Sequence, residues 1–299
     1  MSKTDIEWAD LVWNIITGCD KVSPGCAFCY AEGIAKRFWG DRKFSDVQFH
    51  EDRLLHPLKW KKPQRIFVNS MSDLFHEKVT DEQLDRVFAV TALTPWLTYQ
   101  ILTKRPQRAL DYLSARNVSF RIARAACDIR PETSPSELQK RIKPHLPNVW
   151  LGVTCENQKT ANERIPLLRH CPAAIRFLSC EPLLEEIELF NVDGEVSLAM
   201  QALDERETMF PADVIDWVIV GGESGHNARP CHLDWIRSIV SQCQHCETPV
   251  FVKQLGSLPL QSQKTETGFT TSDLRLKSKK GGDLEEFPND LKIREFPES

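Results

Sequence analysis

Residues 65–92 read RIFVNSMSDLFHEKVTDEQLDRVFAVTA, and this stretch holds one complete strand and helix pair. Residues 65–69 are rich in β-branched and aromatic side chains, which predicts a buried strand. After a short polar run, Thr80 is a suitable N-cap for a helix over residues 81–92, with Gln83 at its third position to complete a capping box. A strand, a polar turn and a helix in this order make up the repeating unit of β/α folds.

The same pattern recurs along the chain. Seven strands are expected, at residues 11–16, 65–69, 97–102, 149–153, 174–178, 217–220 and 249–252. Helical crossovers between strands imply parallel pairing. We therefore expect an α/β fold with parallel strands, either a complete or partial (β/α) TIM-like barrel or an open doubly wound sheet.

Two regions break this repeat. Residues 185–216 are rich in acids and include Asp193-Gly194, which predicts an inserted hairpin or helical excursion. The polar tail from Ser257 onward is expected to be a surface extension. The predicted organisation is a barrel domain over residues 1–256 and a C-terminal extension over residues 257–299.

The composition is that of a soluble globular protein. Hydrophobic residues make up 41% and charged residues 27% of the 299 residues, which excludes a disordered or fibrous chain. The net charge of −4 argues against a surface that is basic throughout. No apolar run approaches the ~18 residues that span a bilayer, and the first residues do not resemble an export signal, so a cytoplasmic protein without a membrane partner is expected.

Three of the ten cysteines lie close together as Cys19, Cys26 and Cys29, with the spacing Cys-x6-Cys-x2-Cys. Cytosolic thiols are mostly reduced, so a cluster of them suggests a metal. Pro24-Gly25 predicts a turn that brings the thiols towards one another. The spacing alone leaves open a structural zinc with a fourth ligand from elsewhere and an iron-sulfur cluster with one iron left for a small molecule. The pair Cys243 and Cys246 has no second pair after it, and a structural role at a helix end is favoured.

Polar residues follow five of the expected strands. They are residues 69–73, 103–106, 154–157, 179–182 and 221–225. In barrels and doubly wound sheets, this is the edge at which substrates and cofactors bind. The residue preferences of ordinary turns explain any one of these strand tips. Five polar tips in series, several with charged side chains, favour a shared pocket instead.

Aromatic residues flank the last loop cysteine, with Phe28 before it and Tyr30 after it, and further short motifs occur along nearly the whole chain. They include Thr4-Asp5-Ile6-Glu7-Trp8, Ser72-Asp73-Leu74-Phe75, Thr103-Lys104-Arg105-Pro106, Gly221-Gly222-Glu223-Ser224-Gly225, Lys253-Gln254-Leu255-Gly256 and Arg294-Glu295-Phe296-Pro297. Together they resemble the radical S-adenosylmethionine (SAM) superfamily, and more closely a phage-associated, radical-SAM-like family of largely unknown function. The commonest superfamily loop is Cys-x3-Cys-x2-Cys, so the longer first interval departs from it.

The resemblance implies a [4Fe-4S] cluster on Cys19, Cys26 and Cys29, with SAM bound to the fourth iron. One-electron reduction, from a donor such as flavodoxin or ferredoxin, would cleave SAM to methionine and a 5′-deoxyadenosyl radical that abstracts hydrogen from a substrate. The phage setting suggests a nucleotide or a nucleic-acid base as substrate, in the host cytoplasm. The cofactor carries this chemistry and the protein orients it.

The resemblance also assigns expected roles to the strand tips. Ser70, Ser72 and Asp73 are candidates for the methionine end of SAM, and Thr103, Lys104 and Arg105 for its carboxylate or a phosphate. Glu156 and Asn157 are candidates for the ribose, while Gly221, Gly222 and Glu223 are candidates for adenine or substrate. The catalytic candidates are Cys155, Cys180 and Glu181. Cys155 and Cys180 come directly after buried strands, where a cysteine is more often a small core residue, while a thiol that faces the pocket is able to donate a hydrogen atom.

A second function from a different class stays open at this point. In this alternative, the three cysteines only staple a non-catalytic binding module, through zinc or a cluster, and the module contacts nucleic acid. Such a protein would contain zinc, or a cluster without a response to SAM. The net charge of −4 gives little support to nucleic-acid binding as the whole function.

Overall fold

The computed structural model describes all residues except 1–3, 144, 193–194, 197–213, 266–267 and 299. The chain divides into two compact units. Unit 1 consists of Met1–Lys21, Ala31–Gly152 and His170–Ile175, and unit 2 consists of Val22–Tyr30, Val153–Arg169 and Arg176–Ser299. Among the helices in the described part of the chain, none combines the length and apolar character needed to cross a bilayer.

Seven strands form one sheet in the order β1-β4-β5-β6-β7-β10-β12. Their bounds are Leu11–Trp13, Arg65–Val68, Thr98–Thr103, Val149–Thr154, Ile175–Cys180, Trp217–Gly221 and Val250–Gln254. All seven expected strands are confirmed. The order follows the sequence without a reversal, which is the order of a β/α barrel, whereas a doubly wound sheet reverses at a switch point. Because β1 and β12 end this order in the described residues, the sheet is that of a partial barrel.

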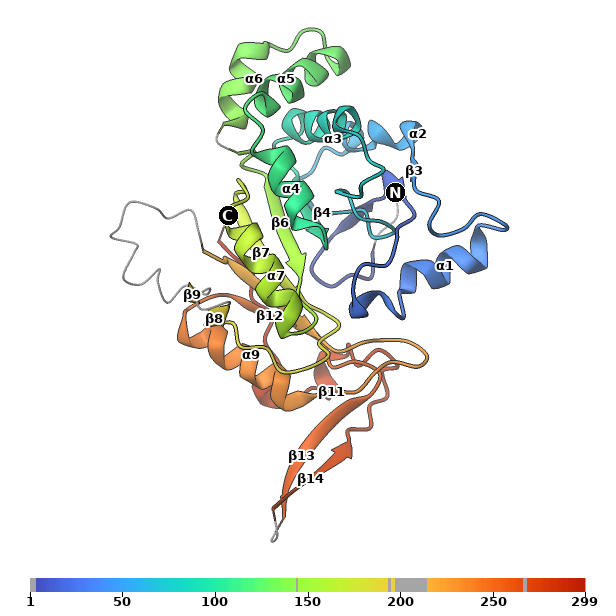
Figure 1. Cartoon of the computed structure of the whole chain (residues 1–299), viewed down its shortest axis with the longest axis vertical. Helices are drawn as coiled ribbons and strands as arrows, with labels where there is room; N and C mark the ends of the chain where they lie inside the picture. Colours follow the sequence, from blue (N-terminus) through green and yellow to red (C-terminus); the bar gives the residue numbers. More distant parts are fainter. Residues whose placement is uncertain (1–3, 144, 193–194, 197–213, 266–267, 299) are drawn as a thin grey trace. The chain divides into compact units, whose positions relative to one another are not determined.

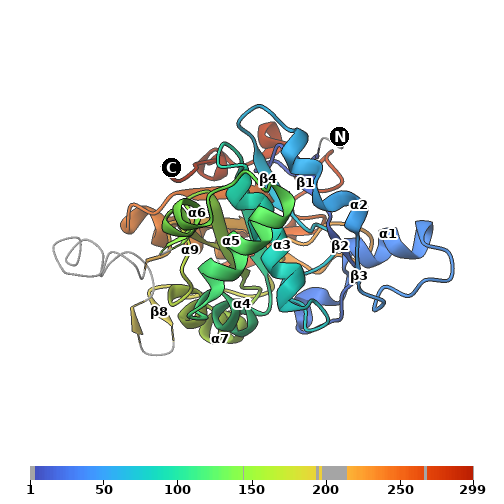
Figure 2. The same cartoon turned by 90° about the horizontal axis from the view of Figure 1, so that it is seen from above.

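In unit 1, β4 pairs in parallel with both β1 and β5. The helices of this part of the chain are α1 (Tyr30–Phe38), α2 (Glu51–Leu54), α3 (Asp81–Leu93), α4 (Pro106–Leu113), α5 (Val118–Ile129) and α6 (Pro135–Ile142). The predicted capping box of α3 is present, since Thr80 and Gln83 bond to each other's backbone. Helices α3 and α5 pack side by side (Figures 1 and 2). A short antiparallel pair, β2 (Ile16–Thr17) and β3 (Gln48–Phe49), follows β1.

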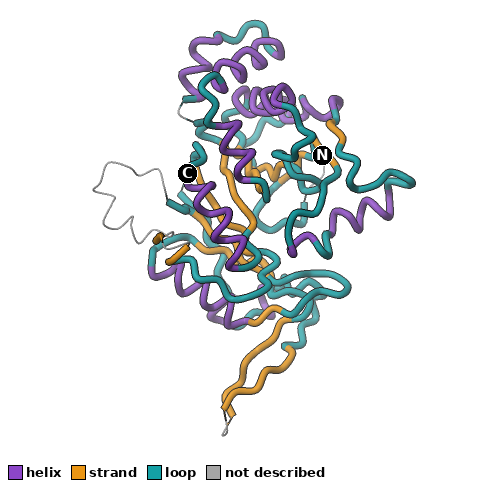
Figure 3. The backbone as a smooth tube through the Cα atoms, in the orientation of Figure 1, coloured by secondary structure: helices purple, strands orange, loops and turns teal. Residues whose placement is uncertain are grey.

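In unit 2, β10 pairs in parallel with both β7 and β12. Helices α7 (Gln158–Arg169) and α9 (Leu233–His245) connect its strands, and Figure 3 shows this alternation of helix and strand along the backbone. A second sheet contains β11 (Cys231–His232), β13 (Pro259–Thr265) and β14 (Gly268–Asp273). The expected hairpin in residues 185–216 is present as antiparallel β8 (Asn191–Val192) and β9 (Glu195–Val196), while residues 193–194 and 197–213 lie outside the described residues.

The last residues of the chain pack against the sheet of unit 2. The Glu295 backbone N–H donates to Val250 O at 3.0 Å, and Trp217 Nε1 donates to Glu295 O at 2.9 Å. The ring of Phe296 lies 5.3 Å from both the Trp217 and Phe251 rings. The motif around Phe296 therefore has a structural role in covering the edge of β10 and β12. The predicted domain boundary at residue 257 stays a prediction.

Candidate functional site

The predicted site residues lie at the carboxyl ends of the sheet strands. In unit 1, Asn69 follows β4 and Thr103 ends β5. In unit 2, Cys155 follows β6, Cys180 ends β7 and Gly221 ends β10. Because the strands paired within each unit are parallel, these tips share one edge of each unit's part of the sheet.

Asp73 gathers three of the predicted residues of unit 1. Its carboxylate accepts bonds from Thr103 Oγ1 at 2.7 Å, from the Lys104 backbone N–H at 2.9 Å and from Arg105 Nη1 at 3.2 Å. It also accepts from the Phe75 backbone N–H at 3.0 Å. These four donors satisfy the carboxylate within the protein, so Asp73 fixes the β5 tip beside the β4 tip.

Ser70 and Ser72 also fasten the β4 tip. Ser72 Oγ donates to Ile16 O at 2.9 Å, and Ser70 Oγ donates to Asn14 Oδ1 at 3.2 Å. Both acceptors lie in the segment that runs from β1 towards Cys19. Through these bonds the β4 tip holds that segment, and the predicted contacts of the two serines with SAM stay predictions.

Cys19 lies beside a buried cation. Its Sγ is 3.7 Å from Nη1 of Arg105, a residue with 7% of its surface exposed. Burial alone would lower the pKa of Arg105, but the charges of Asp73 and Cys19 and the contact with Glu77 raise it above its ordinary value. Arg105 therefore stays cationic beside Cys19, and a fixed positive charge favours the thiolate, which is the form that ligates metals.

Gly18 determines how the chain reaches Cys19. It has a φ of +98°, and a Cβ at this position would lie 2.5 Å from Asp46 O and 2.9 Å from Phe44 O. Phe44 O also accepts the bond from the Cys19 backbone N–H at 2.9 Å. Only glycine fits here without displacing the backbone that holds Cys19.

We expect Gly18→Ala to lower the free energy of unfolding by about 1–3 kcal/mol, because alanine is strained at this φ and meets two carbonyl oxygens. Urea unfolding measures the loss. The matched control is Gly33→Ala inside α1, where an added Cβ meets nothing within 4 Å. That change should stabilise by about 0.5–1 kcal/mol, because alanine loses less backbone freedom than glycine in a helix. Equal effects at the two glycines would contradict this account of Gly18.

In unit 2, Glu156 holds the loop that carries Cys26 and Cys29. The glutamate is fully buried, and its Oε1 accepts from the Gly25 backbone N–H at 3.1 Å. Its Oε2 accepts from Arg164 Nη1 at 2.9 Å, and the same nitrogen donates to Thr154 O at 2.7 Å. One carboxylate thus joins the end of β6, helix α7 and the cysteine loop.

Arg229 is a second anchor for the same loop. Its Nη1 donates to Pro24 O at 3.0 Å, and its guanidinium lies 5.4 Å from the centre of the Phe28 ring. Glu223 orients it by accepting from Nη2 at 2.6 Å and from Nε at 2.9 Å. Hydrogen bonding to Glu223 raises the pKa of Arg229 despite its partial burial. The predicted residue Glu223 therefore acts on the cysteine loop through Arg229.

The exposure of the ten cysteines separates them into two groups. Cys19, Cys26, Cys29 and Cys127 are partly exposed, and the other six are buried. The predicted trio is therefore accessible to a cofactor, and its donor chemistry fits a metal cluster. In the described residues, no three His, Cys, Asp or Glu side chains are gathered closely enough to hold a metal ion.

The catalytic candidates occupy two different environments. Cys155 and Cys180 are fully buried. Burial raises the pKa of Cys180, and the charges of Cys155, Cys243 and Glu156 raise it further, so its thiol stays protonated. Glu181 is partly exposed and pairs with Lys253 Nζ at 2.7 and 2.8 Å. The expectation of small core cysteines fits this burial, and the catalytic roles stay predictions.

The remaining tip residues have internal partners. Asn157 Oδ1 accepts from the Thr160 backbone N–H at 2.9 Å and thereby caps α7. A Cβ on Gly222 would overlap Leu255 O and lie 2.9 Å from Cys231 Cβ. The Gly222 N–H donates to Gln254 O at 3.0 Å. The close approach of β10 and β12 is therefore sufficient to require glycine at this tip.

Two basic residues of the site were assigned no role from the sequence. They are Arg164, which neutralises Glu156, and Lys253, which neutralises Glu181. Arg164 stands eight residues after Glu156, so two turns of α7 return its side chain to the end of β6. A basic residue at this spacing after a strand-end carboxylate is a signal that sequence reasoning can use. For Lys253, 72 residues from Glu181, no local signal exists.

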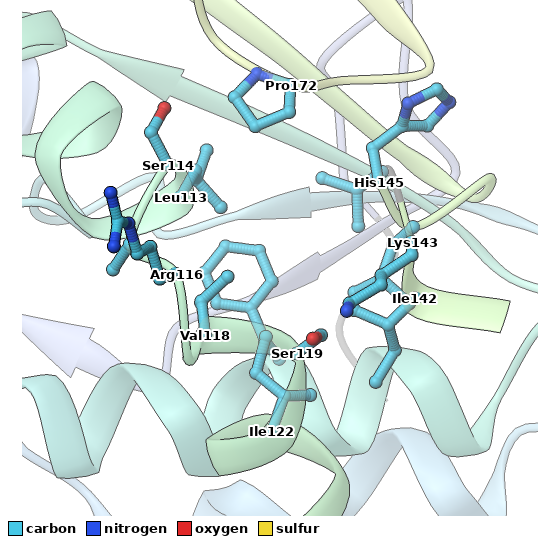
Figure 4. Close-up of a pocket in the computed structure, with 14 residues that line it drawn as sticks. Leu113, Ser114, Arg116, Val118, Ser119, Ile122, Ile142, Lys143, His145 and Pro172 are labelled. Atoms are coloured by element: carbon cyan, nitrogen blue, oxygen red, sulfur yellow. The ribbon is translucent and has the colours of Figure 1, made fainter. Parts of the chain in front are cut away.

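A cavity of about 250 Å³ lies elsewhere in unit 1 (Figure 4). Apolar side chains form most of its wall, with Arg116 and Lys143 on opposite sides of the view. Val149, the first residue of β6, contributes to it, so the cavity is at the amino end of that strand. None of the predicted site residues lines it, and it is separate from the strand tips.

The chain belongs to the family described as "Protein of unknown function (DUF5131)", which it matches over residues 3–285. It matches no curated protein and no solved structure at a significant level.

Proposed function

We propose that this member of the DUF5131 family is a radical SAM enzyme, with Cys19, Cys26 and Cys29 holding a [4Fe-4S] cluster. The observation that carries the proposal is the three-cysteine loop itself. Its thiols are accessible, its Cys19 faces the Arg105 cation, and its Pro24-Gly25 turn is held by Arg229 and Glu156. When bound, the cluster would supply the electron that cleaves SAM into methionine and a 5′-deoxyadenosyl radical.

The residues of the chain would serve this chemistry by holding and orienting. Arg105 favours the thiolate of Cys19, and Glu156 and Arg229 keep the loop of Cys26 and Cys29 in one conformation. The polar strand tips would bind SAM. Cys180 stays a thiol because burial raises its pKa, and a protonated thiol is the form that donates a hydrogen atom. A nucleotide or a nucleic-acid base is the proposed substrate, and flavodoxin or ferredoxin is the proposed electron donor.

The second candidate function is a binding module in which zinc or a cluster only staples the cysteine loop. A specific observation favours it. Three of the predicted ligand contacts already accept hydrogen bonds from the protein through their carboxylates. They are Asp73, Glu156 and Glu223. A SAM-binding site needs polar side chains whose hydrogen-bonding atoms are available to SAM. A loop that is only held together by a metal does not need such side chains.

Anaerobic purification with iron and sulfide reconstitution tests the two functions against each other. The enzyme should hold about four irons per chain and form 5′-deoxyadenosine when dithionite and SAM are added. Stoichiometric zinc, or a cluster without SAM cleavage, would select the staple. A comparison of modified nucleosides from cells with and without the protein would then search for the substrate.

A further inference from the structure

Unit 2 carries a projecting β-ribbon. Strands β13 and β14 pair antiparallel over six residue pairs, from Leu260 opposite Asp273 to Thr265 opposite Gly268. Figure 1 shows the ribbon extending away from α9, in the same unit. Thr270, Thr271 and Ser272 are exposed along β14. The ribbon therefore presents hydroxyl groups to the solvent.

A row of cations follows directly after β14. Arg275, Lys277, Lys279 and Lys280 are all exposed. Leu276 and Ser278, which separate Arg275, Lys277 and Lys279, are partly buried, and Lys280 follows Lys279 directly. The chain bends at residues 277–278 and turns at residues 279–280. The four cations therefore reach the solvent together from one short loop.

These four side chains have no ion-pair partner in the part of the chain that the structure describes. The nearby acids have other roles. Glu286 accepts from the backbone N–H groups of Lys277 at 2.6 Å and Ser278 at 2.8 Å. Asp283 accepts from the Glu285 N–H at 3.1 Å, and Glu285 pairs with Lys292 at 3.6 Å. The exposed Asp273, at the end of β14, is the one acid within residues 270–280, which leaves a charge of +4 − 1 = +3 there.

The backbone beneath the cations is fixed at several points. Leu274 N–H continues the ladder to Pro259 O at 2.9 Å, and Ser257 Oγ donates to Lys279 O at 2.6 Å. Further along, the Leu255 N–H donates to Gly281 O at 2.7 Å. Together with the two bonds to Glu286, these bonds hold the backbone of the segment, while its charged side chains reach the solvent. Binding of a polyanion would therefore cost little backbone ordering.

We propose that residues 270–280 form a contact surface for the phosphodiester backbone of a nucleic acid. The cations neutralise neighbouring phosphates, and the hydroxyls of β14 reach the same strand or an adjacent groove. A two-stranded β-ribbon fits the major groove of a DNA duplex. Because the whole chain has a net charge of −4, we expect the attraction for polyanions to be limited to this patch. The rest of the surface should not bind polyanions in general.

A lipid surface is a poorer fit than a nucleic acid. Segments that lie on membranes bury large apolar side chains in the bilayer beside their cations. Among the side chains that the structure describes, the exposed large hydrophobic ones are Val22, Phe28, Tyr30, Ile34, Phe38, Leu55 and Phe120, and none of them lies within residues 270–280. The row thus offers charge and hydrogen bonds without an apolar anchor.

The inference extends the proposed function by giving a nucleic-acid substrate a place to bind, and it rests on that function only for its biological purpose. Binding is measured without SAM or reductant. Failure of the radical chemistry would therefore leave the binding result intact, and failure of binding would leave SAM cleavage intact.

The experiment measures fluorescence anisotropy of a labelled DNA duplex and of its single strands with the whole protein, between about 50 and 200 mM salt. The test variant changes Arg275, Lys277, Lys279 and Lys280 to Gln. The control variant changes four exposed lysines of unit 1, Lys43, Lys61, Lys62 and Lys140, to Gln. Urea unfolding midpoints check that both variants fold as the wild type does.

We expect the test variant to lose at least about tenfold in affinity, and its slope of log K against log salt to fall in magnitude by about 0.9 for each lost duplex contact. The control should keep both values. A preference for duplex or single strands tells which form supplies the phosphates. Unchanged binding by the test variant, no binding by the wild type, or equal losses in both variants would overturn the proposal. So would binding to phosphatidylserine vesicles, without binding to nucleic acid, that the test variant loses.

Discussion

A chain with Cys26→Ala should lose 5′-deoxyadenosine formation by at least about 100-fold and should not retain a full complement of iron. Three thiolates are the smallest set that holds a [4Fe-4S] cluster with one iron left open, so removal of one of them removes the site. Product formation is measured by chromatography after anaerobic reconstitution with iron and sulfide, and iron content is measured on the same sample.

Cys127 supplies the matched control for this result. It is the fourth partly exposed cysteine, and it lies outside the loop with its Sγ 3.4 Å from Thr133 O. Cys127→Ala should keep both iron content and product formation. If Cys26→Ala and Cys127→Ala behave alike, the loop is not the metal site. If Cys26→Ala loses metal from a wild type that never cleaves SAM, the staple is the better description.

The second large effect is expected for Arg164→Met. Glu156 is fully buried and Arg164 has 5% of its surface exposed, so the change leaves a buried carboxylate without its cation. Breaking a buried pair from one side costs about 3–5 kcal/mol in the free energy of unfolding. Urea unfolding should show this loss. Alkylation of Cys26 should also become faster, because Arg164 no longer orients the carboxylate that accepts the hydrogen bond from Gly25.

Two further variants separate the charge effect from other causes. Lys159→Met, on the same helix, breaks an exposed pair with Glu163 at 3.9 Å and should cost less than about 1 kcal/mol. The double change Glu156→Gln with Arg164→Met removes both charges and should recover part of the lost stability. A double variant no more stable than Arg164→Met would show that packing, rather than the unpaired charge, causes the loss.

The sequence was sufficient for the framework of the fold. β6 and β7 are buried at every residue, so their apolar runs stand out from the rest of the sequence. The start of α3 could also be predicted from local sequence, because Thr80 and Gln83, three residues apart, form its capping box. Whether the barrel is complete could not be predicted, since closure depends on pairing between the first and last strands and the sequence pattern within each strand is the same either way.

The site was predictable as a set of residues but not as a set of contacts. The position of Asp73 after a strand marks it as a tip residue, yet its four donors lie up to 32 residues away. The acidic side chains Glu156 and Glu223 were expected to meet a ligand, whereas they support Gly25 and Arg229. Side chains at a strand end can serve a ligand or the protein, and only the folded chain distinguishes these uses. Their predicted contacts with SAM stay predictions.

The two anchors of the cysteine loop also set an order of events during synthesis. The hydrogen-bond partner of Gly25 is Glu156, 131 residues later, and the partner of Pro24 is Arg229, 205 residues later. While the ribosome is still translating the middle of the gene, Cys26 and Cys29 are already outside the exit tunnel on an untethered loop. Maturation of the proposed metal centre on the tethered loop would therefore follow translation, and truncated products of interrupted synthesis would carry the same thiols without that tether.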